Sequence, residues 1–337
     1  MFWRGFIIVK IHILFNILHI ILNEMISIVC VLFSLILILK GGDLLVESSI
    51  WFAKKAGIPS LIVGATVVSF ATTFPEISVA ILSGIRGVED LAINTALGSM
   101  VCNFALVLGL SFLLVPSFIS KSGLSKKVLF FLSAILVLFV LSFDESLGIT
   151  DAIIMLILFA VYMVSAMLDV RNKPESKNVD DVKLPSWQTI VIQFIVSAFA
   201  VGFGANILVS NIENISMLFG INEGLLGVFI ISIGTNIPEF VTTMTAVRLK
   251  DSAIGIGNIF GASIIDATML VAVTVLSAQK SFIELPKNLS LLTVLVLIII
   301  TGIIVLPIIK NEKSNRLQGS ILVVLFVIYS IFLTKIS

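Results

Sequence analysis

The sequence predicts an all-α polytopic membrane protein with ten core transmembrane helices, arranged as two inverted five-helix repeats. Three observations predict this fold. With 58% hydrophobic and 12% charged residues among 337, the composition is far more apolar than that of a soluble globular protein. Apolar runs also recur at the length of a bilayer crossing. Finally, key residues repeat at one fixed offset along the chain.

Each of the ten apolar runs is long enough for a helix to cross the hydrocarbon core of a bilayer, which takes about 17–25 residues. The runs lie at 26–52, 60–84, 91–115, 127–143, 149–169, 188–212, 223–247, 253–277, 289–309 and 318–335. Helices are expected because backbone in lipid must satisfy its own hydrogen bonds, and because the alternating pattern of barrel strands is absent.

Residues 1–25 form a separate hydrophobic segment that carries Lys10, His12 and His19. Four interpretations stay open for it: an eleventh span, a signal-like segment, an interfacial helix, or sequence upstream of a start at Met25. Cys30 and Cys102 show no metal or redox spacing, so both are expected to be small core residues.

The polar linker 170–187 divides the spans into a first repeat, 26–169, and a second repeat, 188–337. Counted over short loops, fourteen basic residues fall on the side of this linker and four on the other side. This bias predicts a cytoplasmic linker and a C-terminus outside the cell. Because the linker is short and holds no regulatory domain, a prokaryotic plasma membrane is expected.

The two halves share residues at a constant offset of 163. The matching pairs are Gly41 and Gly204, Gly57 and Gly220, Gly64 and Gly227, Thr72 and Thr235, Pro75 and Pro238, Glu76 and Glu239, and Gly98 and Gly261. Each half has an odd number of spans, so the second half enters the membrane with the opposite orientation. Inverted repeats place equivalent segments face to face near the midplane, where secondary transporters bind their substrates.

Two isolated carboxylates dominate the predicted chemistry. Glu76 is the only charged residue between Lys55 and Arg86, and Glu239 is the only one between Glu223 and Arg248. A charge at the centre of a membrane helix costs about 2.5–3.5 kcal/mol on insertion scales. No basic residue in the spans offers an obvious partner, so a bound cation is the expected one.

Neighbouring residues supply further oxygen ligands for such a cation. Thr72 precedes Glu76 by four residues, as Thr235 precedes Glu239, so each hydroxyl shares a helix face with its carboxylate. The prolines at 75 and 238 are expected to free backbone carbonyls near Ala71 and Gly234. Hard cations such as Ca²⁺ prefer this set of oxygens, and Na⁺ uses the same chemistry.

The following helix of each half adds a second polar position. "GSMVCN" ends in Asn103 and "GASIID" ends in Asp266, again 163 residues apart. Gly98 and Gly261 allow close helix approach, so both polar side chains are expected to line the same cavity.

More ordinary interpretations exist for several of these residues. A single Glu beside Pro is compatible with a protonated, hydrogen-bonded structural residue, although the duplication makes this less attractive. Hydroxyls such as those of Ser69, Ser232, Ser99 and Ser263 often serve helix packing. Asp43 and Glu47 are interpreted as interfacial or packing residues, with Lys40 snorkelling or pairing with Asp43.

These motifs resemble those of the sodium/calcium exchanger family. The matching stretches are "ATTFPE" (71–76), "GTNIPE" (234–239), "NTALGSMVCNFALVLGL" (94–110) and "GNIFGASIIDATML" (257–270). The resemblance implies Ca²⁺ coordination by Glu76, Glu239, Thr72 and Thr235. It also implies monovalent-ion sites at Thr73 and Asn236 with carbonyls near Ser69 and Ser232, and a polar ring completed by Ser99, Asn103 and Asp266.

The chain departs from the family pattern at three positions. Asn236 and Ala262 stand where sodium-coupled members usually have serine, and Ser263 replaces a common asparagine. An asparagine at position 236 is similar to the proton-coupled Ca²⁺ exchangers, whereas Thr73 is not. The counter-ion is therefore less firmly indicated than Ca²⁺.

The sequence thus predicts a secondary-active antiporter that exchanges Ca²⁺ for Na⁺ by alternating access, with Ca²⁺/H⁺ exchange as the alternative. A cation channel also uses acidic rings, but two inverted repeats in one chain favour a transporter. An enzyme is not expected, because the only histidines lie in the segment 1–25. No cofactor, nucleic acid or obligatory protein partner is expected beyond the transported ions and the bilayer.

Overall fold

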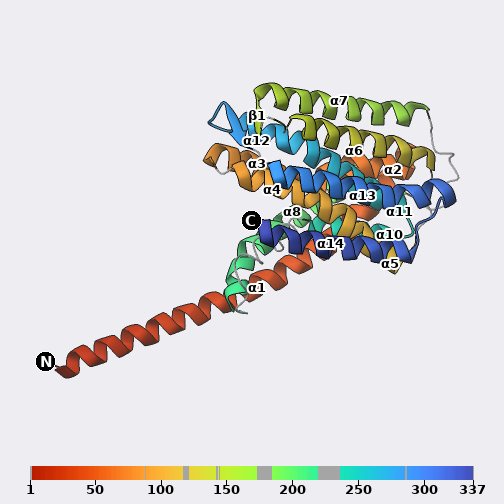
Figure 1. Ribbon diagram of the computed structural model, residues 1–337. Helices are drawn as coiled ribbons and strands as arrows, with labels where there is room; N and C mark the ends of the chain where they lie inside the picture. Colours follow the sequence, from red (N-terminus) through yellow and green to blue (C-terminus); the bar gives the residue numbers. More distant parts are fainter. Residues whose placement is uncertain are drawn as a thin grey trace.

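Helices make up nearly all of the computed structural model, which describes residues 2–87, 89–116, 121–141, 143, 145–172, 184–218, 236–284 and 287–336 (Figure 1). The first half contains α1 (Phe2–Ala56), α2 (Ser60–Val63), α3 (Ser69–Arg86), α4 (Glu89–Val101), α5 (Leu108–Leu114), α6 (Lys121–Leu141) and α7 (Ile149–Asn172). The second half contains α8 (Trp187–Leu218), α10 (Ile237–Arg248), α11 (Ser252–Ile265), α12 (Val271–Ser277), α13 (Lys287–Asn311) and α14 (Arg316–Ile336).

Six helices of the described chain are long and apolar enough to cross a membrane. They are Met25–Ala56, Ala92–Leu114, Leu124–Leu141, Ile149–Leu168, Trp187–Gly204 and Ser252–Ser277. Shorter apolar helices cover Ser60–Phe74, Leu292–Ile304 and Arg316–Phe332. All nine lie on predicted runs, whereas the run 223–247 is described only from Asn236, where it contains α10.

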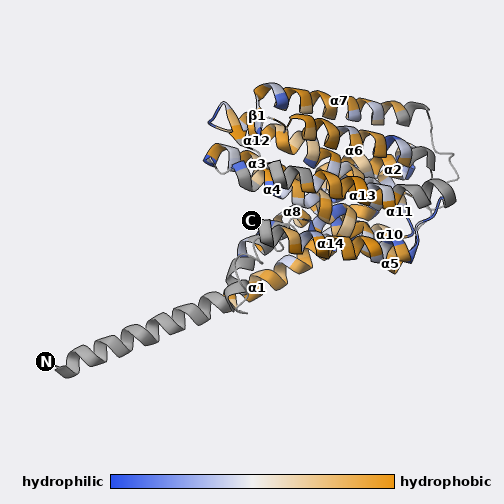
Figure 2. Cartoon of the chain, in the orientation of Figure 1, coloured by the Kyte–Doolittle hydropathy of each residue, from blue (hydrophilic) through white to orange (hydrophobic). Residues whose placement is uncertain are grey.

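The outer helices present apolar side chains to their surroundings. Along α7, the side chains of Ile153, Ile157, Val161 and Val164 are 49–58% exposed. Figure 2 shows that α6 and α7 are hydrophobic over most of their length. Such a surface is unfavourable in water and favourable in the hydrocarbon core of a bilayer.

A short antiparallel strand pair is a feature that the all-α prediction missed. Strand β1 (Ser146–Gly148) pairs antiparallel with β2 (Phe282–Glu284), and Leu147 lies opposite Ile283. Both of these side chains are buried. The pairing therefore buries two apolar residues, one in the connection between α6 and α7 and one in the connection between α12 and α13.

Within the described residues, π-helical segments interrupt the long helices at η1 (Gly64–Val68), η2 (Cys102–Val107) and η4 (Asp266–Leu270). A π turn leaves carbonyl groups displaced from regular α-helical geometry. In η1 the carbonyl of Ala65 accepts a hydrogen bond of 2.6 Å from the Tyr162 hydroxyl of α7. This contact fixes the irregular turn that leads into α3.

The two prolines of the duplicated motif occupy different helical positions. Helix α3 continues on both sides of residue 75, so the first of the two duplicated motifs lies inside a helix. Pro238 lies in the first turn of α10, where its missing N–H removes no helical hydrogen bond. The carbonyl predicted to be freed near Gly234 lies outside the described residues.

Equivalent glycines from the two halves both lie in the contact where α1 packs along α8 (Figure 1). A Cβ atom added to Gly41 would lie 2.9 Å from the Val201 side chain, and one added to Gly204 would lie 2.8 Å from that of Ile38. Neither glycine leaves room for a larger residue without movement of its neighbour. Both therefore permit the close packing of two apolar helices.

A second close crossing joins α2 and η1 of the first half to α11 of the second. A Cβ atom on Gly64 would collide with the Ile254 carbonyl, and one on Gly257 with the Leu61 carbonyl. Beside this crossing the rings of Phe104, Phe131 and Phe260 pack with centroids 4.4–6.3 Å apart. The backbones of the two halves are thus in direct contact at the centre of the molecule.

Asp43 does not form the ion pair suggested for it with Lys40. Its Oδ1 atom lies 2.6 Å from Nη2 of Arg248 and accepts a hydrogen bond of 3.1 Å from Thr245. These contacts tie α1 to the end of α10. Arg248 is 205 positions away in sequence, so only the tertiary fold brings this partner to Asp43.

Candidate cation-binding site

Three buried carboxyl groups lie on helices that cross at the centre of the protein. Glu76 is on α3, Glu239 is in the first turn of α10 and Asp266 is the first residue of η4. Their exposed fractions are 3%, 1% and 1%, and they are close enough to repel one another electrostatically. Like charges are therefore concentrated where water is scarce.

One oxygen of each carboxyl group has no hydrogen-bond partner among the described residues: Oε2 of Glu76, Oε2 of Glu239 and Oδ1 of Asp266. Buried polar atoms in proteins are almost always paired, and an unpaired buried carboxylate is especially unfavourable. These oxygens are consequently suited to a positively charged ligand.

Thr73 connects the two duplicated motifs. Its hydroxyl on α3 lies 3.5 Å from Oε1 of Glu239 on α10, at the limit of a hydrogen bond. Thr72, the next residue back, is also fully buried. The first motif of the chain therefore faces the glutamate of the second.

Ser99 bridges two other predicted site residues. Its Oγ atom lies 3.0 Å from Oδ1 of Asn236 and 2.9 Å from Oδ2 of Asp266. A hydroxyl has only one proton, and the two ends of an amide are assigned from such networks. Both contacts are satisfied if the Asn236 amide donates to Ser99 and Ser99 donates to Asp266.

Asn103 is fully buried in η2, and neither atom of its amide has a hydrogen-bond partner within the described part of the chain. An amide oxygen is a neutral ligand for hard cations. The Asn103 amide is thus available as a neutral ligand, as the sequence predicts.

Ser69 is a predicted site residue that forms hydrogen bonds with residues close to it in sequence. Its hydroxyl donates to the Thr66 carbonyl over 3.1 Å, and a Cβ atom on Gly261 would collide with it. The Ser69 carbonyl accepts a hydrogen bond of 3.2 Å from Thr72. Ser69 therefore sits at a helix crossing, while Ser232 and Thr235 lie outside the described residues.

Asn258 on α11 is a polar neighbour of the site that the sequence argument did not single out. It is fully buried, its Oδ1 atom lies 3.1 Å from Oγ1 of Thr72, and its Nδ2 atom has no partner among the described residues. Thr72 has one proton for two acceptors, the Ser69 carbonyl and Asn258. If the amide is turned to donate to Thr72, the hydroxyl keeps its bond to Ser69 and one oxygen lone pair stays available.

The donor set fits a cation held by mixed oxygen ligands. In the described part of the chain, no group of three or more His, Cys, Asp or Glu side chains is arranged to hold a metal ion. The carboxyl groups of Glu239 and Asp266 lie instead beside the hydroxyl groups of Thr73 and Ser99. Such mixed oxygen sites suit Ca²⁺ and other hard cations.

Comparison with known proteins decides the family. A sequence model described as sodium/calcium exchanger protein matches residues 26–168 and 189–335, which make up most of the chain. The chain belongs to this family. The family is one of transporters rather than enzymes, and membership supports cation/Ca²⁺ antiport.

Individual relatives align over nearly the full chain. The membrane protein MJ0091 of Methanocaldococcus jannaschii is 28% identical over 297 residues, covering 88% of this chain and 94% of that protein. The sodium/calcium exchanger MaX1 of Methanosarcina acetivorans is 23% identical, with coverage of 90% and 97%.

A solved structure of the sodium-calcium exchanger NCX_Mj, soaked with Na⁺ and Sr²⁺, matches with a TM-score of 0.78. Its sequence is 26% identical, and the match covers 90% of this chain and 97% of that one. The helical arrangement described here is therefore that of an exchanger.

Replacing Asn258 with alanine is expected to raise the Michaelis constant for Ca²⁺ about five- to tenfold, since one buried hydrogen bond contributes roughly 1 kcal/mol. Turnover should change little if Asn258 acts by orienting Thr72. Initial rates of Ca²⁺ uptake should be compared for Asn258→Ala, Thr72→Ala and the double variant. The double variant should be no worse than Thr72→Ala alone.

Gln318→Leu is a matched control, because Gln318 is a buried amide that donates to the Ile303 carbonyl far from the carboxylates in sequence. It should lower stability without changing the Michaelis constant. Fully additive losses for Asn258→Ala and Thr72→Ala would contradict the role given to Asn258.

Proposed function

We propose that this protein exchanges Ca²⁺ for Na⁺ across a membrane by alternating access at the site formed by Glu76, Glu239 and Asp266. The observation that carries this proposal is the convergence of three buried carboxyl groups, each with an unpartnered oxygen, on helices of both halves. Ca²⁺, Na⁺ and, in the alternative, protons are cargo of the site, and no resident cofactor is required.

Charge neutralisation provides the coupling in this mechanism. An empty site with ionised carboxylates is unfavourable in a low-dielectric interior, so a change of exposure is opposed. One Ca²⁺ or a set of Na⁺ ions relieves this repulsion by binding the same oxygens. Since only a loaded site changes its exposure, transport of one ion species depends on the gradient of the other.

The proposed topology has ten spans in two inverted five-helix repeats. Three features support it: the offset of 163, the presence of the equivalent Gly41 and Gly204 in the contact between α1 and α8, and π-helical segments at Cys102–Val107 and Asp266–Leu270 in corresponding helices. The bias of basic residues supports a cytoplasmic linker 170–187 and a C-terminus outside the cell, and the prokaryotic relatives support a prokaryotic plasma membrane.

Ca²⁺/H⁺ exchange is the second candidate, and Asn236 is the residue that favours it. Its amide contacts Ser99, which also contacts Asp266, so an amide occupies a place where a hydroxyl ligand would be expected for Na⁺. In that mechanism the carboxyl groups alternate between a protonated and a Ca²⁺-bound state.

Radiolabelled Ca²⁺ uptake into proteoliposomes should distinguish these mechanisms. We expect an outward Na⁺ gradient to drive uptake, whereas an outward proton gradient at the same membrane potential should not. Uptake driven only by protons would overturn the Na⁺ assignment and retain the Ca²⁺ site. Uptake that is independent of both gradients would instead indicate a channel, and absence of uptake would overturn the Ca²⁺ assignment.

A further inference from the structure

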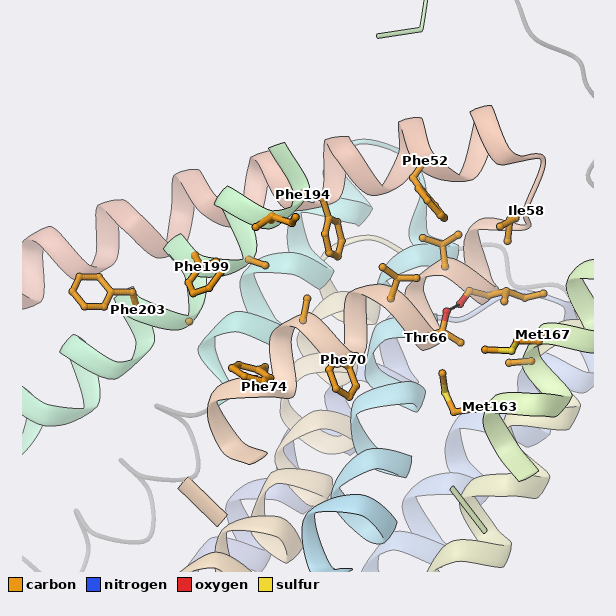
Figure 3. Close-up of a pocket in the computed structure, with 18 of the residues that line it drawn as sticks. Phe52, Ile58, Thr66, Phe70, Phe74, Met163, Met167, Phe194, Phe199 and Phe203 are labelled. Carbon is orange, nitrogen blue, oxygen red and sulfur yellow. Dashed lines mark hydrogen bonds between the residues drawn. The ribbon is translucent and has the colours of Figure 1, made fainter. Parts of the chain in front are cut away.

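A large apolar groove runs along α3, where Phe70 and Phe74 line it (Figure 3). It has a volume of about 960 Å³ and runs between α8 and the end of α1 on one side and α2, η1, α3 and α7 on the other. This volume is at the upper end of the range for ligand pockets in proteins. None of the proposed ion ligands lines the groove.

The walls of the groove are apolar and rich in aromatic rings. Six phenylalanines line it: Phe52, Phe70, Phe74, Phe194, Phe199 and Phe203. Two of its lining residues are polar, Thr66 and Asn206. The Thr66 hydroxyl donates its proton to the Ile62 carbonyl over 2.8 Å. Asn206 lies towards the end of α8 that is distant from Trp187. The middle of the groove therefore suits a hydrocarbon occupant.

One end of the groove carries positive charge and an aromatic anchor. The Phe52 ring contacts Trp187 edge-on at 5.8 Å, and Nζ of Lys55 lies 5.4 Å from the centre of the Trp187 ring. Lys55 donates to the Pro185 carbonyl, which accounts for one of its three N–H groups. Lys54 beside it is exposed.

The length of the groove matches one leaflet of a bilayer. Its lining on α8 extends from Phe194 to Asn206, a rise of about 18 Å for twelve helical residues. One leaflet contributes about 15 Å of hydrocarbon, half of the full core. Tryptophan and lysine are typical of the membrane interface, so the end at Lys55 is suited to a lipid head group.

We propose that this groove binds an anionic phospholipid of the surrounding leaflet, with an acyl chain along the phenylalanines and the phosphate at Lys55. An apolar wall with a cationic end complements this amphipathic, negatively charged ligand. The outer side chains of the neighbouring helix α8, such as Ile192, Val196 and Phe199, are 58–73% exposed. The groove thus opens on a surface suited to lipid.

The bound chain would contact the back of the site helix. Phe70, Ala71 and Phe74 of α3 line the groove, while Thr72 is bonded to Asn258 and Thr73 faces Glu239. A lipid chain bound in the groove therefore constrains α3, the helix that carries Glu76. This contact gives the lipid a route by which to affect the site without touching an ion.

Native mass spectrometry of the delipidated full-length protein tests the proposal without measuring transport. After exposure to phosphatidylglycerol or phosphatidylcholine, the wild type should retain one phosphatidylglycerol in preference to phosphatidylcholine. Ala198→Trp places a large ring in the groove and should abolish this retention. Ala160→Trp, the same change on the exposed face of α7 outside the groove, should retain the lipid.

Lys55→Gln provides a second variant that leaves the groove open. It should lower the preference for phosphatidylglycerol about fivefold, the effect of one lysine near an anionic membrane surface. Equal retention of the two lipids by the wild type would overturn the anionic specificity. Unchanged retention in a folded Ala198→Trp protein would overturn the site itself.

Discussion

Glu76→Gln is expected to reduce Ca²⁺ transport at least about 30-fold, because removing one partner of a buried charge interaction costs some 2–5 kcal/mol. Glutamine keeps the size of the side chain and one carbonyl oxygen but removes the negative charge. Oε2 of Glu76 has no partner among the described residues, so the loss falls on the bound ion rather than on a protein contact. Initial rates of radiolabelled Ca²⁺ uptake into proteoliposomes provide the measurement.

Glu89→Gln is the matched control for this experiment. Glu89 is also a buried glutamate, with 5% exposure, but it lies at the start of α4 and pairs with Lys280 at 3.5 Å. Ten helical residues, about 15 Å, separate it from Ser99. We expect nearly normal transport by Glu89→Gln, and a wild-type rate for Glu76→Gln would refute the shared carboxylate site.

Gly257→Ala is expected to destabilise the protein by about 1–3 kcal/mol, or to prevent its folding, because it overpacks a backbone crossing. Its Cβ atom would collide with the Leu61 carbonyl and lie 2.9 Å from the Ala65 nitrogen. Backbone atoms cannot rotate away as a flexible side chain does. The melting temperature of the detergent-solubilised protein should therefore fall clearly below that of the wild type.

Gly302→Ala separates this steric effect from the general effect of losing a glycine. A Cβ atom on Gly302, within α13, would meet no atom within 4 Å. Alanine is favoured over glycine in a helix by up to about 1 kcal/mol, so this variant should be as stable as the wild type or slightly more stable. Equal losses for the two variants would contradict the crossing as the cause.

The central carboxylates could be predicted because charge in an apolar run is rare. Glu76, Glu239 and Asp266 were selected from sequence spacing alone, and the structure buries all three together. Membership in the exchanger family confirms the predicted resemblance. The duplication also pointed to Gly41 and Gly204, each of which packs so closely against the opposite helix of the α1–α8 pair that a larger residue would force its neighbours to move.

Other features depend on contacts that sequence patterns do not contain. Asn258 has Thr95 at the equivalent position of the first half, so the repeat gave no signal for it. The proposed pairing of Lys40 with Asp43 considered only local neighbours, whereas Arg248 approaches from another helix. The strands β1 and β2 each have three residues, too few for a recognisable alternation.

The segment η2 joins α4 to α5, and η4 joins α11 to α12. In these two continuous helices the number of residues matters as much as their composition. A π turn holds an extra residue, and each residue of an α-helix turns the chain by about 100°. Deleting one residue from η4 would rotate α12 by that angle relative to α11. The carbonyl of Thr274 and the Ser277 side chain, which now pack against Gly84, would then point elsewhere. In these helices a one-residue deletion is thus more disruptive than most substitutions, because it changes the register of every contact that follows.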